Sequence, residues 1–182
     1  MAPTIQKMLN DISQGLSTAS DTALLDAQVL LAHFLGKPRS WLLAHPEARL
    51  ERTVQADIQQ AFLRLQQGEP LPYVIGHWEF FGLDFLLTHH VLIPRPETEL
   101  LVERALAWLN KHPGCTRVAD VGTGSGCIGI ALAMHHPSIR LLMTDISPQA
   151  LEVAQENARR YAISGRMDFQ QADLLDGITS LY

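Results

Sequence analysis

The residues best suited to chemistry lie in one short stretch, in which three alternating glycines follow an acidic residue. The acidic residue is Asp120, and the glycines are Gly122, Gly124 and Gly126. The run 117–121 before them predicts a short buried strand, and a helical pattern follows them. Glycines placed in this way let backbone N–H groups approach a ligand closely at a helix N-terminus. Because a carboxylate repels a pyrophosphate and attracts an ammonium group, the stretch favours a ligand such as S-adenosylmethionine (SAM).

Two further aspartates follow the next two predicted strands. Asp145 ends the strand 140–145, where a carboxylate can accept hydrogen bonds from both ribose hydroxyls of an adenosine ligand. Asp173 follows the strand 167–171 and is placed to accept from an adenine amino group. The purely structural alternatives are that Asp145 caps the helix beginning at Pro148 and that Asp173 lies in a turn.

A dinucleotide is the rival ligand for the same glycines. The G-x-G-x-x-G pattern of NAD-binding proteins is matched by Gly124, Gly126 and Gly129. Asp145 also lies 21 positions after Gly124, as that pattern requires. The charge of Asp120 argues against a dinucleotide, so we consider NAD the less favoured cofactor.

Other side chains carry weaker signals. Arg95, held between Pro94 and Pro96, is either a surface charge at a helix start or a residue facing the ligand pocket, and the sequence leaves both open. The histidine pairs 89–90 and 135–136 predict no metal site, because neighbouring side chains diverge on a strand or a helix.

Residues 1–70 are predicted to be all-helical. The clearest helix covers residues 22–35, with Asp21 as a candidate N-cap, an apolar stripe and Gly36 at its C-terminal end. Further helices are expected at residues 5–13, 40–45 and 51–67.

Residues 71–95 are predicted to connect this bundle to a second region. Prolines bracket an aromatic stretch in which Gly82 separates two apolar runs, which indicates a hairpin. From residue 96 onward helices alternate with strands; the helices are expected at 97–109, 126–135 and 148–162, and the strands at 117–121, 140–145 and 167–171. Alternation of this kind implies an α/β fold with a parallel sheet and right-handed crossovers. These strands form one side of the switch point at which such sheets bind ligands.

The composition limits the class of protein. The chain has 182 residues, of which 47% are hydrophobic and 18% charged, so a packed core is expected. A net charge of −5 gives no basic signature for nucleic acid. No apolar run approaches the roughly 18 residues that a membrane span needs. The two cysteines, Cys115 and Cys127, are expected to be free thiols in a reducing cytoplasm.

Several segments together resemble the HemK/PrmC family, whose members methylate the glutamine of the GGQ motif in peptide chain release factors. Residues 120–126 and 144–147 resemble the SAM-binding motifs of class I methyltransferases, and residues 92–99 (LIPRPETE) are similar to a segment typical of the family. Residues 26–31 and 68–76 also resemble it, so the likeness covers nearly the whole chain.

The resemblance implies a helical domain at 1–70 that helps to dock the release factor, a β-hairpin linker at 71–95 and an incomplete Rossmann-like catalytic domain at 96–182. It implies SAM contacts at Gly122, Thr123, Gly124, Ser125, Gly126, Asp145 and Ile146, in addition to Asp120. A further contact is implied just after the third strand, at Asp173 and Leu174. Family members often carry a bulky aromatic residue where this chain has Leu174.

The main departure from the family is an absence. The Asn-Pro-Pro-Tyr motif, which holds the target nitrogen in related amino methyltransferases, occurs nowhere in the 182 residues. We therefore expect the chain to be the N-terminal part of a glutamine methyltransferase, with no catalytic residue of its own and no significant methyl transfer. The alternative is a non-catalytic module that binds SAM or a release factor, and an unpaired sheet edge would favour self-association.

Overall fold

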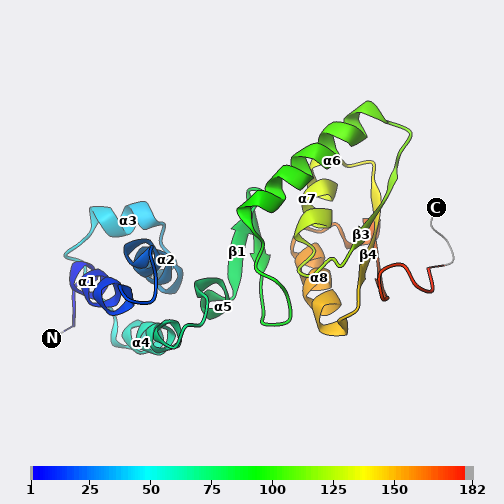
Figure 1. Cartoon of the computed structure of the whole chain (residues 1–182). Coiled ribbons are helices and arrows are strands. Elements are labelled where there is room, and N and C mark those ends of the chain that lie inside the picture. The colour runs from blue at the N-terminus through cyan, green and yellow to red at the C-terminus, as the bar shows by residue number, and fades with distance from the viewer. Residues whose placement is uncertain (1, 179–182) are drawn as a thin grey trace. The chain divides into compact units, whose positions relative to one another are not determined.

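The computed structural model describes residues 2–178, which fall into two compact units (Figure 1). The first unit is Met1–Ile75 and the second is Gly76–Tyr182. In the described part of the chain, no helix is long and apolar enough to cross a membrane.

The first unit consists of helices, as the sequence predicts. They are α1 (Ile5–Leu16), α2 (Ala23–Leu35), α3 (Arg39–Ala44), α4 (Arg52–Gln66) and α5 (Leu71–Ile75). Gly36 ends α2 in the left-handed conformation, with φ of 59°. The predicted N-cap Asp21 is wrong, since α2 begins one residue later and Thr22 takes that position. Helix α5 was not predicted, because five residues are too few to show a helical period.

The predicted hairpin is confirmed and belongs to the second unit. Strands β1 (His77–Phe80) and β2 (Leu83–Leu86) pair antiparallel. Phe81 and Gly82 join them with φ of 53° and 74°, the left-handed pair that a tight two-residue hairpin turn requires. The side chains of Phe80 and Phe85 are buried in the core of this unit.

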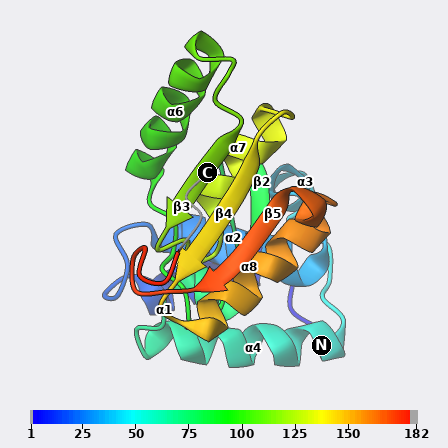
Figure 2. The same cartoon turned by 90° about the vertical axis from the view of Figure 1, so that its right-hand side faces the viewer.

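The second unit contains the predicted parallel sheet. Strands β3 (Arg117–Val121), β4 (Arg140–Asp145) and β5 (Met167–Gln171) follow the order β3-β4-β5, and both pairs are parallel. The helical elements of the unit are η1 (Pro96–Thr98), α6 (Glu99–Lys111), α7 (Cys127–His135), α8 (Pro148–Arg160) and η2 (Ser164–Arg166). Figures 1 and 2 show α7 and α8 against one face of the sheet. Since parallel strands end at the same edge, the loops after β3, β4 and β5 lie together.

The expectation that β3 is buried is wrong. Arg117, Ala119 and Val121 are exposed, and Val118 and Asp120 between them are only half-buried. Within residues 2–178, no strand pairs with the outer edge of β3. Val121, the last residue of β3, is 38% exposed.

We predict that this edge makes the 182-residue chain self-associate, because an unpaired apolar strand recruits strands from other chains. Light scattering over a hundredfold range of protein concentration should show a mass above that of the monomer. Ala119→Lys should reduce the association, because it places a charge on the β3 edge. Gln170→Lys puts the same charge on β5 at the other edge of the sheet and should reduce it less. A monomer at every concentration would contradict the prediction.

Candidate functional site

The glycine turn between β3 and α7 has the conformation that its sequence predicts. Gly122, Gly124 and Gly126 have φ of 72°, 55° and 81°, a region that L side chains rarely adopt. A Cβ added to Gly122 or Gly124 would meet nothing within 4 Å, so the outer side of the turn is open to a ligand. The turn is held from below by the carbonyl of Thr144 in β4, which accepts from the N–H groups of Gly122 and Thr123, both at 2.8 Å.

Asp120 braces this turn from the strand before it. Its Oδ2 accepts hydrogen bonds from Thr123 Oγ1 at 2.8 Å and from the N–H of Gly129 at 3.0 Å. Gly129 can approach because it has no side chain; a Cβ there would lie 2.6 Å from the Met143 side chain. Burial raises the pKa of Asp120 above its usual value; these two hydrogen bonds partly oppose the shift, and the charge of Asp145 adds to it. A carboxylate with a raised pKa at a turn marks a candidate functional site.

Asp145 links two loops at the ends of the strands. Its Oδ2 accepts from the N–H of Gly124 at 2.9 Å, and its Oδ1 accepts from the N–H of Ser147 at 3.0 Å. The side-chain cap of α8 is Ser147, whose Oγ accepts from the N–H of Ala150 at 3.2 Å. Asp145 therefore joins the glycine turn to the loop that leads into α8, and each of its oxygens keeps a lone pair for a ligand.

The remaining predicted contacts lie in the loops after β4 and β5. Ile146 and Leu174 are 65% and 72% exposed, and Asp173 is also exposed. Hydrogen bonds hold these loops together: Thr144 Oγ1 donates to the carbonyl of Leu174 at 3.2 Å, and Gln171 Nε2 donates to the carbonyl of Ile146 at 3.0 Å. The structure thus brings three loops to one edge of the sheet, with apolar side chains available to pack on a flat ring.

Two of the predicted site residues, Arg95 and Ser125, do not belong to the exposed surface of these three loops. Arg95 is exposed at the start of η1, which leaves both of its alternatives open. Ser125 is 2% exposed, and its Oγ has no hydrogen-bond partner within residues 2–178. A buried hydroxyl without a partner in the turn fits a ligand that carries polar groups.

Asn157 is a residue of the site that the sequence analysis missed. It lies in α8, is completely buried, and its Nδ2 donates to the carbonyl of Ser125 at 2.9 Å. A sequence signal was available: Asn157 is an amide among the apolar positions of an amphipathic helix, one turn after Ala154. That helix face touches the turn, since a Cβ on Gly126 would lie 3.2 Å from the Cβ of Ala154.

We predict that Gly126→Ala disrupts the turn. The alanine would have to adopt the left-handed backbone conformation of Gly126, and its Cβ would lie 2.9 Å from Ile130 Cδ1. The free energy of unfolding should therefore fall by about 1–3 kcal/mol. Gly165→Ala is the matched control, because its Cβ meets nothing within 4 Å and its φ is not in the strained region. Urea denaturation of both variants checks the prediction, and equal losses would contradict it.

Two known protein families match this chain, one in the helical first unit and one in the second unit. The family described as PrmC N-terminal domain matches residues 7–76, and the family described as Methyltransferase small domain matches residues 97–181. A release factor glutamine methyltransferase of Koribacter versatilis is 44% identical over 154 residues, which are 85% of this chain and 54% of that protein. One from Vibrio cholerae is 41% identical over 171 residues, 93% of this chain and 59% of that protein. The chain therefore spans between half and two thirds of the length of these curated relatives.

Among solved structures, a tRNA (uracil-54, C5)-methyltransferase of Pyrococcus abyssi in complex with S-adenosyl-L-homocysteine is similar with a TM-score of 0.44 and 18% identity. The similarity covers 53% of this chain and 23% of that chain.

Proposed function

Since the chain belongs to the PrmC/HemK release factor glutamine methyltransferase family, we propose that its second unit binds SAM and that the whole protein methylates a release factor. The methyl acceptor is the side-chain amide of the glutamine in the GGQ motif. The helical domain at residues 1–70, which makes up most of the first unit, helps to dock the release factor. Residues 71–95 connect it to the SAM-binding domain.

One observation carries the proposal: two aspartates at the ends of adjacent parallel strands flank one glycine turn. Asp145 binds the N–H of Gly124 inside the turn, and Asp120 binds Thr123 and Gly129 beside it. The two carboxylates, both hydrogen-bond acceptors, therefore lie on either side of the glycine turn. This arrangement suits a ligand with hydroxyl donors at one end and an ammonium group at the other.

The described residues fit SAM, and each has a physical role in holding it. Asp145 accepts from the ribose hydroxyls, and Asp120 attracts the ammonium group of the methionine part. Ile146 and Leu174, both exposed beside Asp145, pack against the adenine, and Asp173 accepts from its amino group. The sulfonium of the cofactor supplies an electrophilic methyl group, so the protein has only to bind and orient the two reactants.

The methyl transfer itself is assigned to the whole protein. An amide nitrogen is a poor nucleophile, because its lone pair is delocalised into the carbonyl, and it must be oriented before it can attack. The Asn-Pro-Pro-Tyr motif that does this in related enzymes is not in these 182 residues. We therefore propose SAM binding, without significant transfer, for the 182-residue chain. Its free thiols Cys115 and Cys127 are consistent with a reducing cytoplasm as its location.

Isothermal titration calorimetry of the 182-residue chain tests the cofactor assignment. We expect saturable heat with SAM and none with NADH, because the charge of Asp120 repels a pyrophosphate. Heat with NADH alone would replace the proposal by a dinucleotide-binding function. Heat with neither ligand would contradict the SAM site.

A further inference from the structure

The hairpin and the glycine turn are far apart in sequence and share one side chain in the structure. Asn157 Oδ1 accepts from the N–H of Leu86 at 2.7 Å, and its Nδ2 donates to the carbonyl of Leu86 at 3.0 Å. The same Nδ2 donates to the carbonyl of Ser125 at 2.9 Å. A single amide in α8 therefore holds the last residue of β2 and the middle of the glycine turn.

All the donors of that amide are used, and in a way that few other side chains could reproduce. An asparagine amide has two N–H donors and one carbonyl oxygen, and here both nitrogen contacts and the oxygen contact are to backbone atoms. An aspartate has no donor for the two carbonyls, and a leucine has no polar group at all. Since Asn157 is completely buried, its loss would leave the buried carbonyl of Ser125 without this partner, and the half-buried backbone groups of Leu86 would lose it as well.

The contact to Ser125 bears directly on the turn. The N–H of Gly126 donates to the carbonyl of Thr123 at 2.8 Å, which closes a tight turn over the intervening residues. Fixing the carbonyl of Ser125 fixes the peptide plane that it shares with Gly126, and α7 begins directly after that glycine. Asn157 thus holds the peptide group that directly precedes α7.

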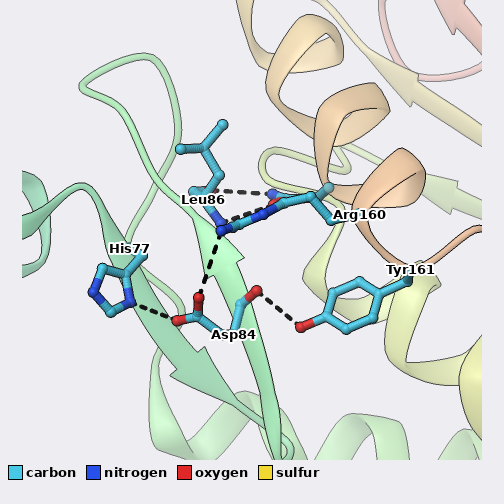
Figure 3. Close-up of polar contacts among 6 residues, drawn as sticks. His77, Asp84, Leu86, Arg160 and Tyr161 are labelled. Atoms are coloured by element: carbon cyan, nitrogen blue, oxygen red, sulfur yellow. Dashed lines mark hydrogen bonds and ion pairs between the residues drawn. The ribbon is translucent and has the colours of Figure 1, made fainter. Parts of the chain in front are cut away.

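A second set of contacts attaches the same hairpin to the same helix without reaching the turn. Tyr161 Oη donates to the carbonyl of Asp84 at 2.8 Å, and the Arg160 guanidinium lies 3.8 Å from the Asp84 carboxylate (Figure 3). His77 pairs with that carboxylate from β1. These contacts join the hairpin to the C-terminal end of α8 nearer the surface, and none of them involves the glycine turn.

We propose that Asn157 is a positioning residue that couples the hairpin to the SAM-binding turn. The inference rests on the proposed function, because it assigns a support to the same site. The hairpin is then part of the cofactor site and not only a connector between two units. A purely structural Asn157 would hold the hairpin in place and leave the affinity for SAM unchanged in the folded protein.

Calorimetry with SAM on three forms of the 182-residue chain separates these roles. All are measured at a temperature at which circular dichroism shows each to be fully folded. Asn157→Leu should lower the affinity at least tenfold relative to the unchanged chain. Tyr161→Phe removes the parallel hairpin–α8 hydrogen bond and should stay within twofold. Unchanged affinity in Asn157→Leu, or an equal loss in Tyr161→Phe, would overturn the inference.

Two further outcomes are covered by the same design. Absence of SAM binding by the unchanged chain would overturn the proposed function and this inference with it. If Asn157→Leu does not fold, amide hydrogen exchange of the unchanged chain is compared with and without SAM. Coupling predicts that SAM slows exchange at the Leu86 N–H more than at the Arg166 N–H, which bonds to the carbonyl of Ile163 instead. Equal slowing at both amides would overturn the inference.

Discussion

Replacing Asp145 by alanine is expected to weaken SAM binding by about 2–4 kcal/mol, or about 30- to 700-fold. The physical reason is the loss of two ribose hydrogen bonds to a charged acceptor, each of which contributes about 1.5–3 kcal/mol without full additivity. The structure adds a second reason, since Asp145 also holds the N–H of Gly124 in the turn. Calorimetric titration of the variant with SAM measures the effect.

Asp168→Ala is the matched control for this prediction. Asp168 is an exposed aspartate of the neighbouring strand β5; it is the second residue of the strand and lies away from the loops at its carboxyl end. Its loss should leave the SAM affinity within twofold. An Asp145→Ala chain that binds SAM as tightly as the unchanged chain would show that Asp145 serves only to join the two loops.

The three parallel strands of the second unit could be predicted to the residue because their signal is local. Each is a run of five or six residues bounded by turn-forming positions, such as the glycines that follow β3 and the Ser164-Gly165 pair before β5. The structure places β3, β4 and β5 at the predicted bounds. The alternation of helix and strand then determines a parallel sheet, and with it the edge at which Asp120, Asp145 and Asp173 gather.

The features that could not be predicted depend on contacts between distant parts of the chain. Asn157 and Leu86 are separated by 71 positions, and no local pattern links them. Likewise, the Arg166 guanidinium donates to the carbonyl of Ala133 at 2.8 Å, near the C-terminal end of α7, where a cation is favourable. The exposure of β3 was missed for a different reason: apolar residues indicate a buried strand only where a neighbouring strand or helix covers it.

Asp120→Asn is expected to make the protein more stable and its SAM binding weaker. Asparagine can still accept from Thr123 and Gly129 through its oxygen, but it carries no charge to be desolvated. Because burial raises the pKa of Asp120 in the folded state, the folded protein binds its proton more tightly than the unfolded chain does. This tighter proton binding adds to the free energy of unfolding. The contribution is fully present below the unfolded pKa of Asp120, about 4, and is lost as the pH rises through its raised folded pKa.

The unchanged chain should therefore lose stability over that pH range relative to Asp120→Asn, and the variant should have the larger free energy of unfolding at pH 7. Urea denaturation at several pH values measures the difference. The SAM affinity should move in the opposite direction, by about 1.5–3 kcal/mol, because an ammonium group loses a charged acceptor. Gain of stability with loss of affinity would show that the protein keeps a costly, partly desolvated charge for its ligand. Gain of stability with unchanged affinity would remove Asp120 from the SAM site and leave it as a brace of the turn.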